Sequence, residues 1–423
     1  MRHPRLFKNI ACSGIVLLLC IQVIAQQTPP TRISWDRFLN TVMQHPDIVK
    51  EKEKVNLTRL DIDVAKIKPD PELEFGNVCG DISGINMAQQ WYVGVNYTIE
   101  TGNKRKYRIQ YARSSVQLEE AEFELFVLDF ARSALKQYYQ CWVLEQKINQ
   151  LKHYHHLLPP IKPGSVSDSL SHLRQLIMLE HDKLALADAQ HQYEEAIQAL
   201  QGFVDYLYPD SMVLPDTAIN PEYIFSMNDV NQQYSIKNHA ELKVKSMMEQ
   251  MANDELLMTQ HNRIPDISFS LGNNFIARAT NPEAPSPAYN AITATLSVPL
   301  KFSNMNKSEL KIIQYNKEAA MEELRNEWDE KEDELSDLQY QLRRLDTRIK
   351  HVKVLIEHQT SLVEKVGKIN PLLLDEEYQR LKHYHQLYWE STEKLIGVHL
   401  DLSFMTGRYE KLIGSTVAGM PTD

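Results

Sequence analysis

The sequence is short of glycine, of basic charge and of long apolar runs. Only 14 of its 423 residues are glycine, and leucine, glutamate, glutamine and lysine are common, which is typical of helix-rich proteins. Beyond the first 27 residues, no segment is apolar enough for a transmembrane helix. The formal net charge of −10 argues against nucleic-acid binding, and no basic patch with interleaved aromatic residues is present.

Signatures of catalysis and of bound cofactors are also missing. The sequence contains no Ser–His–Asp motif, no phosphate-binding glycine loop and no nucleotide fingerprint. Two cysteines lie beyond the N-terminal segment, Cys79 and Cys141, and neither has metal-ligand spacing around it. A disulfide between them is neither required nor excluded. We therefore predict that the protein is not an enzyme and holds no cofactor and no metal.

The N-terminus has the pattern of a secretory signal peptide, which we assign to residues 1–25. An apolar core over 10–24 ends at a plausible cleavage site, 23–25. The basic residues before this core are Arg2, Arg5 and Lys8. We therefore expect an exported chain. Because a membrane span must satisfy its own backbone hydrogen bonds, any insertion of the mature chain would use β-strands.

The chain contains a long internal repeat. His45 precedes Pro71 by the same distance as His239 precedes Pro265, since 71 − 45 and 265 − 239 are both 26. Further on, the segment Ile-Gln-Tyr recurs at 109–111 and 313–315, so the offset between copies has grown from 194 to 204. A repeat of this length indicates a duplicated structural unit rather than a solenoid of small modules.

Each copy has the same predicted order of helix, strand, strand, long helix and long helix. In the first repeat, the leading helix runs from Trp35 to about residue 67. The first repeat covers 34–204, with a β-hairpin at about 71–99 and long helices at about 104–157 and 167–204. A connector follows over 205–233. The second repeat covers 234–407, with a β-hairpin at about 265–300, long helices at about 307–366 and 372–406, and then a tail over 408–423.

The predicted strands alternate between apolar and polar residues. Over 91–99, every second residue is apolar: Trp91, Val93, Val95, Tyr97 and Ile99. An ordinary half-buried hairpin shows the same alternation, but four strands in two distant hairpins are too few for a soluble sheet with its own core. Strands of about ten residues with one apolar face fit the wall of a membrane barrel. Four strands cannot close a barrel, so several chains must contribute.

The predicted long helices carry heptad seams. In the second repeat, leucine, isoleucine and valine recur in alternating steps of three and four, at Leu335, Leu338, Leu342, Leu345, Ile349, Val352 and Ile356. In the first repeat, two apolar stripes run side by side over 118–148. A helix with two stripes packs against neighbours on both sides, as the wall of a helical barrel requires. A solvent-exposed coiled coil is the alternative.

Two segments at strand ends resemble a known family. They are Tyr-Thr-Ile-Glu-Thr-Gly-Asn-Lys-Arg over 97–105, followed by Arg108 and Ala112, and Val298-Pro299-Leu300. The first is similar to the basic, glycine-containing segment where a strand passes into a long helix in the TolC-like outer-membrane efflux and secretion proteins of Gram-negative bacteria. The second is similar to that family's strand end in its second repeat. Together with the duplicated plan over 34–407, they identify the chain as resembling this family.

This resemblance implies a mainly α protein with membrane β-strands that assembles as a homotrimer. Three chains would form a twelve-stranded β-barrel in the outer membrane and a twelve-helix barrel reaching into the periplasm. The implied function is an exit duct of a tripartite efflux or type I secretion system, whose partners are outer-membrane lipid, a periplasmic adaptor (membrane fusion) protein and an inner-membrane pump. The resemblance does not distinguish between drugs, metal ions and proteins as the cargo. The rival interpretation is a soluble periplasmic coiled-coil adaptor or scaffold.

The resemblance also points to two groups of site residues. One is the strand-to-helix segment, with Gly102, Lys104 and Arg105. The other is the helix tips, which would form the gate and the adaptor-docking site: Pro163, Gly164, Ser165, Asp168, Asn370, Pro371 and Asp375. Asp168 and Asp375 either cap helices or form acidic rings that narrow the tunnel.

Two further clusters have two interpretations each. The histidines at 153, 155, 156, 383 and 385 lie on a polar helix surface or contact metal as cargo. The acidic run over 318–334 is a solvated helix face or a tunnel lining that favours cations.

Overall fold

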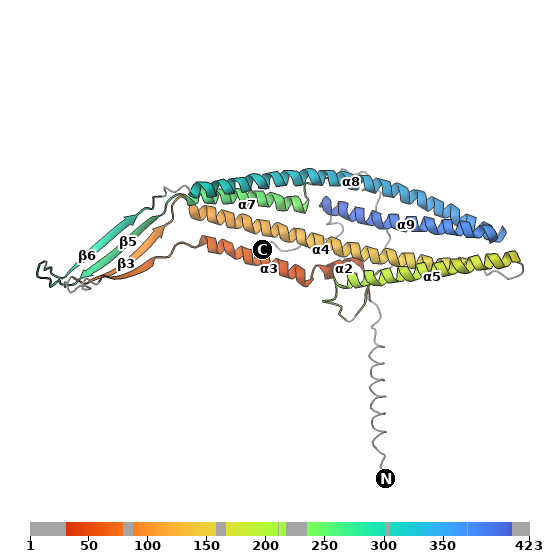
Figure 1. The fold of residues 1–423 in the computed structure, drawn as a ribbon, viewed down its shortest axis with the longest axis horizontal. Coiled ribbons are helices and arrows are strands. Elements are labelled where there is room, and N and C mark those ends of the chain that lie inside the picture. The colour runs from red at the N-terminus through yellow and green to blue at the C-terminus, as the bar shows by residue number, and fades with distance from the viewer. Residues whose placement is uncertain are drawn as a thin grey trace, which may run out of the picture. The chain divides into compact units, whose positions relative to one another are not determined.

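The computed structural model describes eight segments of the chain: 31–78, 88–157, 166–209, 211–216, 235–283, 285–300, 305–369 and 371–407. The predicted signal peptide and the predicted tail lie outside them. The described chain is mainly helical (Figure 1). It also contains one two-stranded and one four-stranded sheet. Within these segments, every helix is too short or too polar to cross a membrane.

Contacts divide the chain into two compact units. The strand unit contains residues 50–125 and 240–330, and the helical unit contains residues 1–49, 126–239 and 331–423. Each unit takes residues from both predicted repeats. The duplicated segments are therefore interleaved within each unit and do not fold as two separate globular domains.

Long helices dominate both units. Their bounds are α2 Trp35–Val42, α3 Pro46–Lys66, α4 Lys104–Leu157, α5 Val166–Gln201, α7 Ala240–Asn262, α8 Met305–Ile369 and α9 Pro371–Met405. The helix α4 has 54 residues, or about 80 Å at about 1.5 Å per residue. It contains no proline and no glycine, so nothing in its sequence interrupts the backbone ladder. Along α8, five seam residues are buried: Leu335, Leu338, Leu342, Leu345 and Val352.

The expectation of one continuous helix from Trp35 to about residue 67 is wrong. The helix α2 ends at Val42 and α3 begins at Pro46. Proline lacks an N–H and its ring clashes with the carbonyl four residues earlier, so a helix cannot pass through it unbroken. At the first position of a new helix the same ring is favourable. His45 precedes that position, and its Nδ1 accepts a hydrogen bond from the backbone N–H of Asp47 at 3.2 Å.

A short sheet that the sequence pattern missed lies in the helical unit. The strand β1, Thr31–Ile33, pairs in parallel with β4, Val213–Pro215, which lies in the predicted connector. Both strands face the hydrophobic core of this unit, where Ile33 and Val213 are buried with Phe38, Tyr138 and Leu200. The hydroxyl of Tyr138 donates a hydrogen bond to the carbonyl of Ile33 at 3.0 Å. The connector is therefore anchored to α4.

The strand unit contains a four-stranded antiparallel sheet. Its strands are β2 Glu72–Val78, β3 Gln90–Ile99, β5 Ile267–Ile276 and β6 Tyr289–Ser297, in the order β2-β3-β5-β6. The two predicted hairpins are joined by the pairing of β3 with β5, which runs from Gln90↔Ile276 to Ile99↔Ile267. The strands β2 and β6 lie at the two edges of the sheet in this single chain.

The two faces of this sheet differ in polarity. On one face, apolar residues line up across the strands, and Phe75 and Ile292 are 73% and 81% exposed. The other face carries Thr98, Ser268 and Ser270. There the Tyr92 side chain lies against Gly94 and Gly272, where an added Cβ would lie 2.2 Å from its hydroxyl oxygen and 2.3 Å from its Cε2, respectively. Its hydroxyl lies 3.1 Å from Ser270 Oγ. Glycine at both positions therefore makes room for this ring.

Candidate functional site

The first candidate site is the junction at which β3 passes into α4. Gly102 and Asn103 both adopt the left-handed region, with φ of 66° and 58°. At Gly102 an added Cβ would lie 2.5 Å from Ile264 Cδ1 and 2.8 Å from Ile264 Cβ. Glycine is required there for two reasons. Other residues rarely adopt this backbone conformation, and the Ile264 side chain already fills the space that a Cβ would occupy. These two residues turn the chain so that the helix begins at Lys104.

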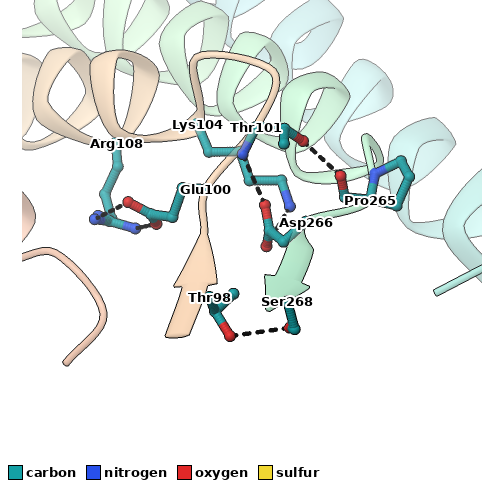
Figure 2. A network of polar contacts seen from close by, with 8 residues as sticks. All are labelled: Thr98, Glu100, Thr101, Lys104, Arg108, Pro265, Asp266 and Ser268. Carbon is teal, nitrogen blue, oxygen red and sulfur yellow. Dashed lines mark hydrogen bonds and ion pairs between the residues drawn. The ribbon is translucent and has the colours of Figure 1, made fainter. Parts of the chain in front are cut away.

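A single carboxylate, Asp266, holds this turn to the start of β5 (Figure 2). The backbone N–H of Thr101 donates to Asp266 Oδ1 at 3.0 Å, and Lys104 Nζ lies 2.7 Å from Asp266 Oδ2. The Thr101 hydroxyl donates to the carbonyl of Pro265 at 2.5 Å. The side chain of Lys104 is only 9% exposed, so this ion pair is well shielded from solvent. It connects the two repeats directly.

Arg108 forms the second half of the junction. Its Nη1 lies 2.6 Å from Glu100 Oε1, as Figure 2 shows. Its Nε donates to the carbonyl of Ala65 at 3.0 Å and its Nη2 to the carbonyl of Ile67 at 2.9 Å. Helix C-termini leave carbonyls without intrahelical partners. Arg108 therefore satisfies the end of α3 and ties it to the strand end at Glu100.

An aromatic contact completes the junction. The ring of His261 stacks on that of Tyr107, with centroids 3.8 Å apart and planes 17° apart. Its Nδ1 lies 2.7 Å from the carbonyl oxygen of Gly102. A carbonyl accepts only, so this ring nitrogen carries the proton. The network contains no nucleophile–base pair, so its groups are suited to fixing the direction of the chain between strand and helix.

Of the residues predicted for this segment, Gly102 and Lys104 belong to the network. Arg105 does not, and its Nε is buried with no hydrogen-bond partner among the described residues. The prediction missed Asp266 and Glu100 as partners. A sequence signal existed for Asp266, because Pro265-Asp266 answers Pro71-Glu72 in the repeat. It did not indicate which cation the carboxylate would meet.

The predicted tip residues fall largely outside the described part of the chain. Pro163, Gly164, Ser165 and Asn370 lie in segments that the structure does not describe. Asp168 lies in α5, Pro371 begins α9, and Asp375 lies in α9, but their side chains are also outside the description. The role of these residues as gate and docking site therefore remains a prediction.

A second candidate site joins α5 to α9 within the helical unit. The hydroxyl of Tyr378 donates to Asp182 Oδ2 at 2.9 Å, and Lys382 Nζ pairs with Asp182 Oδ1. Tyr378 is fully buried and Asp182 nearly so. Tyr378 packs in an apolar cluster with Met178, Val363, Leu374 and Leu381. Because removing one partner of a buried ion pair is costly, this contact is a strong link between the two helices.

The histidines have different surroundings. His383 is exposed, whereas burial lowers the pKa of His385 to about 4. The Nδ1 of His385 contacts Gln150 Nε2, and Gln150 Oε1 accepts from Trp389 Nε1. Among the described residues, no three His, Cys, Asp or Glu side chains are grouped so as to hold a metal ion. Cys141 is buried with a free thiol, and Cys79 lies outside the described residues.

Comparison with known proteins identifies solved structures that share this fold. No family model and no curated protein matches the sequence. Several solved structures match in shape at low identity. The MtrE outer-membrane channel of Neisseria gonorrhoeae, in its open state, matches with a TM-score of 0.66 at 11% identity, covering 88% of each chain. The transmembrane channel CusC gives 0.64 at 13% identity, covering 88% of this chain and 91% of that one.

The outer-membrane channel OprN gives a TM-score of 0.65 at 9% identity, covering 90% of this chain and 93% of that chain. The chain therefore has the fold of these outer-membrane channels. The resemblance to the TolC-like family that the sequence suggested is confirmed at the level of the fold. The matched proteins are channels and not enzymes.

Proposed function

We propose that this protein is a passive exit duct of the outer membrane of a Gram-negative bacterium, extending into the periplasm. The observation that carries the proposal is the four-stranded sheet, which has one exposed apolar face and one polar face. In water such a face would be a liability. In a bilayer it is the lipid-facing side of a barrel wall, and the polar side lines a lumen.

The dimensions of the apolar face fit a bilayer. Along β3, Trp91 and Tyr97 share this face and are six residues apart, or about 20 Å at about 3.4 Å per residue. The register places Phe275 beside Trp91 and Phe269 beside Tyr97. Aromatic residues thus lie toward both ends of the apolar band, which is the arrangement of barrel walls at membrane interfaces.

The two sheet edges support a trimer. Edge strands with unpaired backbone groups cannot face lipid, so β2 of one chain would pair with β6 of the next. Three copies give twelve strands, enough to enclose a lumen. Exposed apolar residues on the helices also support a trimer. They are Leu57, Leu60 and Val64 on α3, and Ile312 and Tyr315 on α8. Neighbouring copies would cover these stripes and complete a helical barrel of twelve helices.

The gate would lie at the helix tips, over 159–170 and 367–376, including the predicted residues there. The link from Asp182 to Tyr378 and Lys382 holds α5 to α9. Opening by a change in superhelical packing would require this link to loosen. A periplasmic adaptor and an inner-membrane pump, in a tripartite efflux or a type I secretion system, would supply the interaction energy for that change and select the cargo.

The first test is membrane fractionation, followed by the mass of the detergent-extracted complex. We expect a trimer in the outer-membrane fraction and discrete conductance steps when this trimer is added to a planar bilayer. A monomer or dimer that stays in the periplasm without detergent would overturn the proposal and favour the soluble adaptor or scaffold. A membrane trimer without conductance would indicate a scaffold in place of a duct.

A further inference from the structure

The junction fixes which side of α4 continues the apolar face of the sheet. Ile99 and Ile267 are register partners on the apolar face. Side chains alternate along extended chain, so the neighbouring carboxylates Glu100 and Asp266 lie on the polar side. Lys104 reaches Asp266 and Arg108 reaches Glu100. Positions 104 and 108 of α4 therefore face the polar side.

The opposite side of α4 carries two exposed cations. At about 100° per residue, Lys106 and Arg113 lie about 200° and about 180° around the helix from Lys104. Both are exposed. They lie on the side of α4 that continues the apolar strand face ending at Ile99, with Lys106 in the first turn and Arg113 about 13.5 Å along the axis from Lys104. Neither forms an ion pair with another described residue.

The charge distribution of this helix start calls for an explanation. Residues 104–118 contain five basic residues and no acidic residue. The dipole of a helix favours carboxylates over cations in its first turn. The ion pairs with Asp266 and Glu100 account for Lys104 and Arg108. Lys106 and Arg113 have no such partner, and on their side of the helix the first carboxylate is Glu120, which pairs with Arg59 at 2.8 Å.

We propose that Lys106 and Arg113 bind the phosphate of an anionic lipid headgroup where the strands of the sheet meet α4. This inference rests on the proposed function, because lipid headgroups lie beside the start of α4 only if the sheet is inserted in a membrane. Lysine offers phosphate a compact charge and arginine a planar fork of donors. The two are seven residues apart, about 10.5 Å along the axis, within reach of one headgroup for two long side chains.

Arg105, between Lys104 and Lys106, is not part of this site. Its Nε is buried without a hydrogen-bond partner among the described residues. An atom without accessible surface cannot be reached by a headgroup outside the protein, so the proposal depends on Lys106 and Arg113 alone.

The test is the affinity of the detergent-solubilised trimer for phosphatidylglycerol, measured by native mass spectrometry of bound lipid against lipid concentration. The variant is Lys106→Gln combined with Arg113→Gln. Each basic side chain near an anionic lipid surface contributes about fivefold in affinity, so we expect the double variant to bind about 25-fold more weakly. The matched control is Lys183→Gln with Lys350→Gln, which removes two charges from the helical unit and should leave affinity unchanged.

Three outcomes would overturn the inference: equal phosphatidylglycerol affinity in wild type and double variant, no preference of wild type for phosphatidylglycerol over phosphatidylcholine, or equally tight binding of inorganic phosphate. The last would assign the site to a free anion. Fractionating the same preparations separates this failure from that of the proposed function. An outer-membrane trimer with unchanged lipid binding overturns the lipid site alone, whereas a wild-type chain outside the membrane overturns both.

Discussion

Lys104 Nζ lies 2.7 Å from Asp266 Oδ2 and joins the first turn of the first long helix to the residue that precedes β5. The two residues belong to different repeats, so the contact fixes one repeat on the other at the point where strands become helices. With the Thr101 and Arg108 contacts, it ties the ends of α3 and β3 and the start of β5 to the first turns of α4. Forces between the sheet and its helices would pass through this junction.

Replacing Asp266 should therefore loosen the junction. In Asp266→Asn the amide keeps an oxygen for the Thr101 N–H, but Lys104 loses its counter-charge while remaining shielded. We expect a loss of about 1–3 kcal/mol in unfolding free energy, below that of a fully buried pair because Asp266 is 30% exposed. Thermal unfolding of the detergent-solubilised protein measures it. Asp63→Asn, at an exposed pair with Lys66, should change stability by less than about 0.5 kcal/mol.

Gly102→Ala tests the turn itself. Alanine at φ of 66° is strained, and its Cβ would contact Ile264 at 2.5 Å. We expect destabilisation of at least about 1–2 kcal/mol. The matched control is Gly397→Ala in α9, where an added Cβ meets nothing within 4 Å. There the higher helix propensity of alanine should stabilise by about 0.5–1 kcal/mol. Equal effects at both positions would contradict the strain at Gly102.

These residues also show what sequence can predict here. The long helices follow from heptad spacing without proline, and the strands β3 and β5 from strict alternation, because both signals are local. The strands β1 and β4 were not predicted, because a strand of three residues is too short to show an alternating pattern. Their pairing, such as Thr31 with Val213, also joins residues that are distant in sequence. Gly102 and Lys104 were identified by resemblance. Asp266, the partner of Lys104, could not be identified in the same way, because its pairing depends on a register between repeats that no local pattern encodes.

If the chain is the duct proposed above, the link between Asp182 and Tyr378 should restrain its opening. Tyr378→Phe keeps the ring in its apolar cluster but removes the hydroxyl that donates to Asp182. We expect a loss of about 1–2 kcal/mol in stability, together with higher single-channel conductance or open probability in planar bilayers. Tyr384→Phe removes a hydroxyl elsewhere on α9 and should leave conductance unchanged. If Tyr378→Phe conducts as wild type does, the link has no part in gating.

His385 should make the stability of the helical unit depend on pH. Burial lowers its pKa from 6.5 to about 4, so between these values the unfolded chain binds a proton that the folded chain does not. Stability is therefore fully present above about pH 6.5 and falls as the pH drops toward 4. Because the His385 side chain is partly exposed, we expect this loss of stability to be only about 1–2 kcal/mol. Unfolding measured from pH 7.5 to 4.5 should show this loss in wild type and a smaller loss in His385→Gln, which cannot take up the proton. His191→Gln, at a histidine whose side chain is 77% exposed, should retain the wild-type profile, and an equally steep profile in His385→Gln would assign the pH dependence to other groups.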